Sequence, residues 1–208
     1  SCVEHWEKLD EYERLNTSLG AFVKDFEVPE RFTRKVKRTM GNVALMAVVT
    51  AEEALKDAGL LGDEIITNGR TGVSYGSSTG SLDAILDFYS MCIDKEVKLL
   101  NSGSYIKMMP QTTAVNISLY FQTHGRLIPT STACTSGSMG IGYAYEAIKD
   151  GYQDVMIAGG AEEIPPTQVG VFDTLYATSS KNNTPELTPS PFDKNRDGLV
   201  IGEGAGTL

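Results

Sequence analysis

The run Asp154–Ala158, apolar from Val155 onward, constrains the fold of this chain more than any other segment. A strand without polar alternation is typical of a sheet that is covered on both faces. The segments before it fit such a sheet, since residues 126–133 are predicted to form a strand and residues 136–150 a helix that ends at Gly151. These three elements predict an α/β fold whose sheet is covered by helices.

The rest of the chain extends this pattern. Apolar residues recur at helical spacing over 39–59, and Gly59 is the predicted stop. Residues 72–76 are predicted to form a strand, residues 111–122 a helix, and residues 198–207 a last strand. Ser81 is expected to cap a further helix, whose predicted inner face comprises Leu82, Ile85, Leu86 and Tyr89. The order α, β, α, α, β, α, β, β again indicates an α/β fold.

Both ends of the chain look cut. Position 1 falls in a segment that resembles a helix with no strand before it, and the last predicted strand stops at Leu208 with no element after it. We therefore expect residues 1–208 to be one partial domain, truncated at both ends. A complete small domain is the alternative, because 208 residues with 41% hydrophobic content suffice for one compact core.

Composition excludes several classes of protein. No apolar run approaches the roughly 18 residues that a membrane helix needs, and the first residues lack the features of a secretory signal. A formal net charge of -9 argues against a nucleic-acid partner. Cys2, Cys92 and Cys134 are too widely spaced for a disulfide framework or a zinc site. We expect a cytoplasmic protein in a reducing compartment, with no metal and no membrane span.

One stretch departs from the acidic balance, because five cations crowd into residues 31–38. They are Arg31, Arg34, Lys35, Lys37 and Arg38. Clustered positive charge on a negative protein attracts an acidic partner electrostatically. The alternative is an ordinary solvated helix start.

Cys134 stands between the predicted strand 126–133 and the predicted helix 136–150. A tight turn there projects the side chain, and the helix directs its free N–H groups and positive dipole end at the sulfur. Both features stabilise the thiolate over the thiol, and the same amides can hold an oxyanion when a thioester carbonyl is attacked. The pattern predicts a nucleophile, and a buried small hydrophobic residue remains the alternative.

Small residues dominate the helix after Cys134. Gly137, Gly140 and Gly142 would each cost about 1 kcal/mol against alanine in an exposed helix. They predict that a neighbouring backbone or a substrate approaches the helix closely. Cys92, at a helical position among apolar residues, is expected to be structural.

Three ordered segments resemble the β-ketoacyl-[acyl-carrier-protein] synthases, the elongating condensing enzymes of the thiolase superfamily. Residues 132–137 (Thr-Ala-Cys-Thr-Ser-Gly) resemble the active-site signature of these synthases. Residues 154–162 resemble the strand after the nucleophile helix, and residues 191–206 resemble the long signature that closes the N-terminal half. Three ordered matches over about 75 residues are far more specific than one motif.

The resemblance implies a thiolase-like fold of two α/β halves in five layers, usually as a homodimer, with this chain as the N-terminal half. It implies acyl transfer from acyl carrier protein to Cys134, then decarboxylative condensation with malonyl carrier protein in fatty acid biosynthesis, without metal or cofactor. The family also uses two histidines and a lysine of its C-terminal half. Because His5 and His124 match no catalytic position, we expect the 208 residues alone to be inactive.

The resemblance also assigns secondary positions. Arg34, Lys35 and Arg38 align with a basic stretch that docks the carrier protein, and Phe172 aligns with a phenylalanine beside the nucleophile. Thr79 falls where many members carry a bulky aliphatic at the floor of the acyl pocket. Tyr176 stands where some members have arginine. Without the resemblance, Phe172 would be assigned to the core.

Other functions remain open on the sequence. A thiolase acting on acyl-coenzyme A uses the same nucleophile position, and a polyketide ketosynthase uses the same chemistry. A catalytically inert partner subunit would usually lack the cysteine. The glycines at 202, 204 and 206 are weak evidence for a nucleotide loop, and a strand bend explains them better. Asp193, Arg196 and Asp197 are expected to form an internal salt-bridge corner.

Overall fold

The computed structural model describes residues 2–97 and 100–208, which form two compact units. The first unit comprises residues 1–27 and 163–204, and the second comprises residues 28–162 and 205–208. Within the described residues, no helix is long and apolar enough to cross a membrane.

A four-stranded sheet organises the second unit, in the order β4 (Leu127–Thr130), β3 (Thr71–Gly76), β5 (Val155–Glu162) and β6 (Gly204–Thr207). The central strand β3 pairs in parallel with β4 on one side and β5 on the other. Ala158 and Leu208 exchange both backbone hydrogen bonds, at 2.9 and 2.8 Å, as antiparallel partners do. Every residue of β3 is buried, as expected of a central strand covered on both faces.

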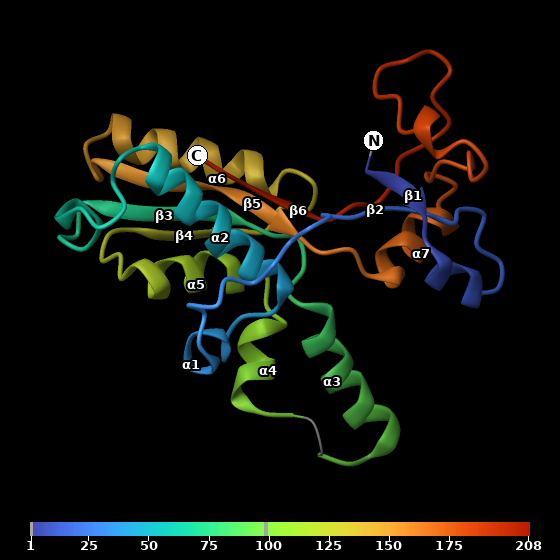
Figure 1. Cartoon of the computed structure of the whole chain (residues 1–208), viewed down its shortest axis with the longest axis horizontal. Coiled ribbons are helices and arrows are strands. Elements are labelled where there is room, and N and C mark those ends of the chain that lie inside the picture. The colour runs from blue at the N-terminus through green and yellow to red at the C-terminus, as the bar shows by residue number, and fades with distance from the viewer. Residues whose placement is uncertain (1, 98–99) are drawn as a thin grey trace. The chain divides into compact units, whose positions relative to one another are not determined.

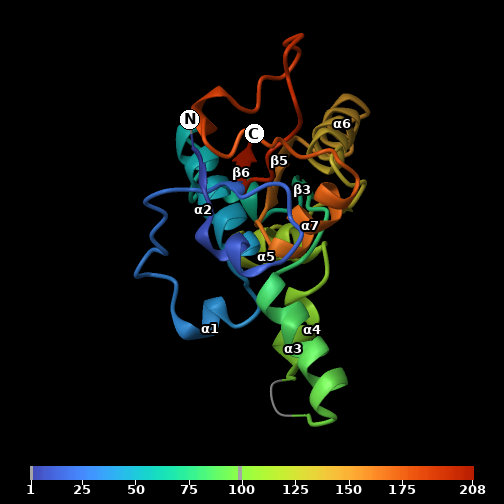
Figure 2. The same ribbon diagram turned by 90° about the vertical axis from the view of Figure 1, so that its right-hand side faces the viewer.

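Helices cover both faces of this sheet (Figures 1 and 2). α6 (Ser136–Lys149) lies on one face, and α2 (Asn42–Asp57) with α5 (Thr112–Phe121) lies on the other. α2 buries nine of its 16 residues, which include most of its valines and alanines. The prediction of an α/β fold with a helix-covered sheet is therefore confirmed, as are helices close to the ranges 39–59, 111–122 and 136–150.

Two further helices, α3 (Leu82–Asp94) and α4 (Ser102–Lys107), run alongside each other and point away from the sheet (Figure 1). The predicted inner face of α3 is wrong in part. Leu86 and Tyr89 are 49% and 62% exposed, and only Ala84 is fully buried. Helical periodicity predicts which residues share a face, but a neighbour must be present to bury that face.

The first unit is held by a small core and a two-stranded sheet. β1 (Val3–His5) pairs antiparallel with β2 (Leu19–Ala21). Leu9 of the short 3-10 helix η1 (Glu7–Glu11) packs with Ile164 and with Val169 of α7 (Pro166–Thr174). The remaining elements are α1 (Arg34–Lys37) and the 3-10 helices η2 (Glu64–Ile66), both in the second unit, and η3 (Pro185–Leu187) in the first.

Two boundary predictions were wrong. Position 1 lies outside the described residues, and the segment just after it is not a helix, because Val3–His5 form a strand whose partner lies 16 residues further on. The predicted strand 198–207 is a strand only from Gly204, while Leu199 and Gly202 each make a single bridge to another segment. Both errors concern pairing with distant segments, which a local pattern does not contain.

Candidate active site

The carboxyl ends of three parallel strands meet at one edge of the sheet. Gly76 of β3 is in register with Thr130 of β4 and with Gly160 of β5. The segments that follow these strands, residues 77–81 and 131–135 and the end of β5, therefore share this edge. In open α/β sheets, ligands bind at the carboxyl ends of strands.

Cys134 lies at this edge, in the turn between β4 and α6, and its side chain is exposed. Ala133 adopts a left-handed conformation with φ of 52°, which is uncommon for a residue with a side chain. The turn is closed by Thr135 N donating to Thr132 O (3.2 Å) and by Ser136 N donating to Ala133 O (3.0 Å). The strained turn leaves the Cys134 side chain exposed beyond the end of β4.

Ser136 holds both sides of this turn. Its hydroxyl donates to Ala133 O (2.6 Å) and accepts from Thr132 N (2.9 Å), while its carbonyl accepts from Thr130 Oγ1 (2.8 Å). The amide of Met139 begins the helical ladder by donating to Thr135 O. Gly137 and Ser138 stand in the first turn, whose amides have no partner inside a helix. These amides are candidate donors for a developing oxyanion.

The small residues of α6 bring it against the sheet. A Cβ on Gly140 would lie 2.9 Å from Ser74 O and 3.1 Å from Gly159 O, so the helix nearly touches the backbones of β3 and β5. A Cβ on Gly76 would lie 2.5 Å from the carbonyl of Ser136, so β3 ends directly beneath the start of the helix. The predicted close approach of a neighbouring backbone is confirmed at Gly140, while Gly142 faces open space.

Thr79 lies at the same edge, and its side chain is engaged by a carboxylate. Thr79 Oγ1 donates to Glu162 Oε1 (3.0 Å), and Ser78 N donates to Glu162 Oε2 (2.7 Å). The sequence analysis missed this pairing of Glu162 with residues 77–79. The available signal was a run of three hydroxyl residues after one strand and a glutamate ending another.

The basic segment is an anchored, exposed surface in the same unit. Arg31 is not free, because its guanidinium pairs with the buried carboxylate of Glu52 (2.8 Å). Phe32 is buried and packs on Tyr120, with ring centroids 4.9 Å apart. Among the described residues, no ion pair engages the four exposed cations Arg34, Lys35, Lys37 and Arg38.

Phe172 and Tyr176 lie in the first unit. Phe172 is half-buried on α7, and Tyr176 is 87% exposed after that helix. Its neighbour Asp173 is buried and accepts from the amides of Asn16 (2.9 Å) and Thr17 (3.1 Å). Burial would raise the pKa of Asp173, but hydrogen bonds from Thr178, Asn16 and Thr17 outweigh it and hold the pKa below its ordinary value.

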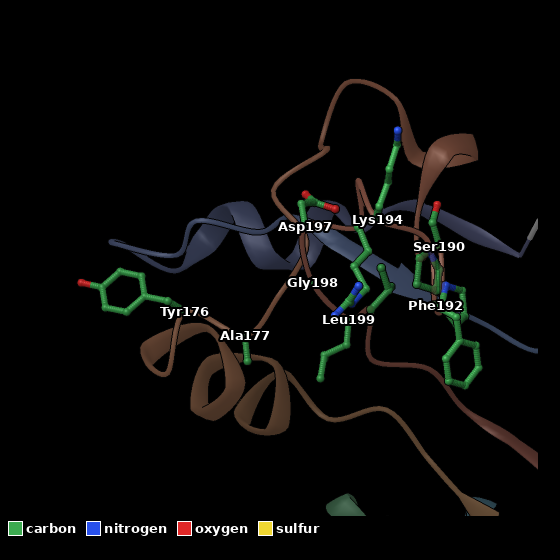
Figure 3. Close-up of a pocket in the computed structure, with 12 residues that line it drawn as sticks. Tyr176, Ala177, Ser190, Phe192, Lys194, Asp197, Gly198 and Leu199 are labelled. Atoms are coloured by element: carbon green, nitrogen blue, oxygen red, sulfur yellow. The ribbon is translucent and has the colours of Figure 1, made fainter.

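A cavity of about 990 Å³ opens within the first unit, between residues 176–177 and 189–200 (Figure 3). At its wall, Asp197 accepts from Ser179 Oγ and Ser180 N (both 3.0 Å) and pairs with Lys181 Nζ (3.5 Å). Arg196 donates to the carbonyl of Asp193 (2.9 Å). The predicted internal salt-bridge corner is wrong, because Asp193, Arg196 and Asp197 are exposed and the ion pair recorded for Asp197 is with Lys181.

The two histidines have different surroundings. His5 in the first unit contacts Ser18 Oγ (2.9 Å) and Asp10 Oδ2 (2.8 Å), and His124 is exposed in the loop before β4. In the described part of the chain, no group of three or more His, Cys, Asp or Glu side chains could hold a metal ion.

Comparison with known families identifies the family of this chain and, with it, the fold. The family described as "Beta-ketoacyl synthase, N-terminal domain" matches residues 4–208. The chain belongs to this family. The three ordered motifs therefore indicated the correct family, and the thiolase-like α/β fold follows from it.

Relatives of this β-ketoacyl synthase domain agree. It is 32% identical to 3-oxoacyl-[acyl-carrier-protein] synthase 2 of Vibrio harveyi, over 99% of this chain and 49% of the relative. A β-ketoacyl synthase from Burkholderia phymatum STM815 superimposes with a TM-score of 0.95 at 52% identity, over 100% of this chain and 51% of that one. The chain thus spans about half the length of the relatives that it matches.

A second similar structure comes from a polyketide synthase. It is described as a type II polyketide synthase acyl-carrier protein in complex with its ketosynthase bound to the hexaketide. The similarity is 27% identity with a TM-score of 0.74, over 99% of this chain and 50% of the other. Relatives of this synthase domain therefore occur among both 3-oxoacyl-carrier-protein synthases and polyketide ketosynthases.

Proposed function

We propose that this chain supplies the nucleophile of a condensing enzyme that extends acyl chains bound to acyl carrier protein. The observation that carries this proposal is Cys134, which is exposed on a strained turn at the carboxyl edge of the sheet, beside the start of α6. The chain around it matches the β-ketoacyl synthase family from residue 4 to residue 208. The retained cysteine argues against an inert partner subunit, and the family match favours a synthase over a thiolase.

The reaction would run in two steps through Cys134. The Cys134 thiol gives up its proton, and its thiolate attacks the acyl thioester of a carrier protein to form an oxyanion. The carrier's sulfur then leaves as a thiolate that takes up that proton, while the acyl group stays on Sγ. The unpaired amides at the start of α6 are donors for that oxyanion. Malonyl carrier protein then loses CO2, its carbanion attacks the acyl carbon, and the C–C bond forms as the Cys134 thiolate departs. The product is a β-ketoacyl chain two carbons longer.

The second step needs acid–base groups that the family supplies from its C-terminal half. Decarboxylation and carbanion formation require positioned donors, yet the chain has only His5 and His124. We therefore propose that condensation requires residues beyond these 208, and that the chain alone does not condense. The chain's span of about half the length of its relatives supports this proposal.

The outer face of α6 supports the same proposal. Five large apolar side chains of α6 are between 36% and 64% exposed, namely Met139, Ile141, Tyr143, Tyr145 and Ile148. Apolar side chains exposed in this number on one helix are usually covered in a working protein. A second α/β half would bury this face beside Cys134.

The basic segment is the proposed carrier-protein contact. Arg34, Lys35 and Arg38 are exposed, and Arg31–Glu52 and Phe32–Tyr120 anchor the short helix that bears them. A fixed cluster of cations on an acidic chain attracts an acidic partner and sets its orientation. The known complex of a related ketosynthase with an acyl-carrier protein supports this partner class. A homodimer in the cytoplasm remains a prediction.

Fatty acid synthesis is the favoured pathway, and polyketide synthesis is the second candidate. The similarity to 3-oxoacyl-[acyl-carrier-protein] synthase 2 over 99% of the chain supports the first. The similarity to the hexaketide-bound ketosynthase supports the second. A single condensation that stops at one β-ketoacyl product, rather than repeated condensation to a poly-β-keto chain, would favour fatty acid synthesis.

The test is the intact mass of the full-length protein before and after exposure to an acyl-carrier-protein thioester, with peptide mapping of the adduct. We expect one acyl group on Cys134, absent in Cys134→Ala. Cys92→Ser is the matched control, because Cys92 is also exposed but lies on α3, and this variant should be acylated normally. An unmodified Cys134 in the full-length protein would refute the assigned chemistry.

A further inference from the structure

Glu162 is a half-buried carboxylate that the proposed chemistry does not use. It ends β5, at the same edge of the sheet as Cys134. Its two oxygens accept from Ser78 N (2.7 Å), Thr79 Oγ1 (3.0 Å) and Thr79 N (3.4 Å), and from the hydroxyl of Ser78. Ser77 Oγ lies 3.2 Å from Glu162 Oε1 and also contacts the carbonyl of Thr79, and its one hydrogen can be donated to either. One side chain thus holds Ser78 and Thr79 and lies within hydrogen-bond distance of Ser77.

The first of those residues, Ser77, also contacts the strand that leads to Cys134. Ser77 N donates to Thr130 O (3.2 Å), four residues before the thiol. Thr130 Oγ1 in turn donates to Ser136 O (2.8 Å), at the start of α6. A continuous set of hydrogen bonds therefore runs from Glu162 through residues 77–79 to both ends of the turn that carries Cys134.

The far end of the segment is also fixed. Ser81 N donates to Lys107 O (2.7 Å), and a Cβ on Gly80 would lie 2.2 Å from the carbonyl of Met108. Residues 77–79 therefore span a short gap between α4 and the end of β4. Glu162 accepts hydrogen bonds from this segment between the two fixed points.

Charge matters for this role. Hydrogen bonds to a carboxylate are roughly twice as strong as those between neutral groups. An ionised carboxylate accepts hydrogen bonds through both oxygens and donates none. A glutamine amide offers one acceptor oxygen, and its NH₂ group would face the N–H and O–H donors of residues 78 and 79. Glutamine keeps the shape of Glu162 but cannot satisfy the donors on both sides.

We propose that Glu162 is a positioning residue for Cys134. Glu162 holds residues 77–79 against the end of β4 and so fixes the turn that presents the thiol to the amides of α6. The proposal rests on the proposed function for the role of Cys134. It predicts a loss in the rate of acyl transfer, because misplacement of the thiol relative to its oxyanion donors affects the transition state more than binding.

The test compares variants of the full-length protein by the rate of acyl transfer from an acyl-carrier-protein thioester. For Glu162→Gln we expect a kcat at least tenfold lower with KM within threefold of wild type, and for Glu162→Asp an intermediate rate. Thr50→Val is the control for stability alone, because it removes the 2.9 Å bond to Thr207 Oγ1 at the β6 side of the sheet. A normal rate per folded molecule in Glu162→Gln, or an equal loss in Thr50→Val, would overturn the proposal.

A double variant tests the route of the effect. If Glu162 acts through residues 77–79, Ser78→Ala should slow transfer by about twofold to fivefold, as an estimate for one lost hydrogen bond, and should add little to Glu162→Gln. If the rate losses of Ser78→Ala and Glu162→Gln multiply in the double variant, Glu162 does not act through residues 77–79. Ser78→Ala also provides the test if Glu162→Gln fails to fold.

Alkylation of Cys134 by iodoacetamide separates this proposal from the proposed function. If wild type takes no acyl group, the proposed function fails, and the alkylation rate still tests the positioning. We expect that rate to fall at least threefold in Glu162→Gln, measured by peptide mapping against Cys92 as an internal reference. An unchanged ratio of the two rates would refute the positioning.

Discussion

The glycines of α6 allow a prediction in which two almost identical substitutions have opposite effects. At Gly140 an added Cβ would lie 2.9 Å from Ser74 O and 3.1 Å from Gly159 O, both backbone atoms that cannot rotate away. At Gly142, two residues along the same helix, an added Cβ meets nothing within 4 Å. Alanine should therefore destabilise the protein at the first position and stabilise it at the second.

The magnitude follows from two terms. Alanine in place of glycine favours a helix interior by about 1 kcal/mol at both positions. Overpacking at Gly140 costs about 1–3 kcal/mol, because α6 or the sheet must shift. The helix term cancels in the difference between the two variants, which leaves about 2 kcal/mol. With a urea dependence of roughly 2 kcal/mol/M, the unfolding midpoints should differ by about 1 M.

The assay is urea unfolding of the 208-residue chain, followed by circular dichroism, for wild type, Gly140→Ala and Gly142→Ala. Equal midpoints for the two variants would refute the close approach of α6 to β3 and β5. Repeating the pair in the full-length protein adds a test of the outer face. If Gly142→Ala destabilises only the longer protein, another segment covers that face of α6.

Three further outcomes are expected. Reversing two charges in Lys35→Glu/Arg38→Glu should raise KM for the carrier-protein thioester about tenfold at low salt, less at high salt, while Lys8→Glu leaves it unchanged. Asp173→Asn should lower the free energy of unfolding by about 1–3 kcal/mol at pH 7. Because the folded pKa of Asp173 is depressed, that difference is fully present above about pH 4 and disappears as pH falls through the folded pKa, which unfolding curves across pH would show. Tyr75→Phe should cost about 1–2 kcal/mol, measured by thermal unfolding, because its buried hydroxyl contacts Thr207 Oγ1 (3.0 Å) and Gly160 O (3.2 Å).

The sequence alone determined the elements with strong local signals. The helix after Cys134 and the apolar strand beginning at Val155 were predicted close to their observed bounds, because periodicity and glycine stops are local properties. The turn at Cys134 was predicted for the same reason, since the predicted strand 126–133 and helix 136–150 leave only residues 134–135 between them. In the structure β4 already ends at Thr130, so the turn is longer than predicted. The ordered motifs then identified the family without any knowledge of the fold.

Only the tertiary structure decided which segments meet. The pairing of Val3–His5 with Leu19–Ala21, the exposure of Leu86 and the contact of Glu162 with residues 77–79 all join positions whose relation no local pattern records. Glu162 and Ser78 are 84 residues apart, yet parallel strands place their ends at one edge. Sequence periodicity specifies which side of an element is apolar, whereas the partner of that side depends on how the whole sheet is ordered. The environment of Cys134 is therefore a property of the sheet order β4-β3-β5, because that order brings the ends of three strands together.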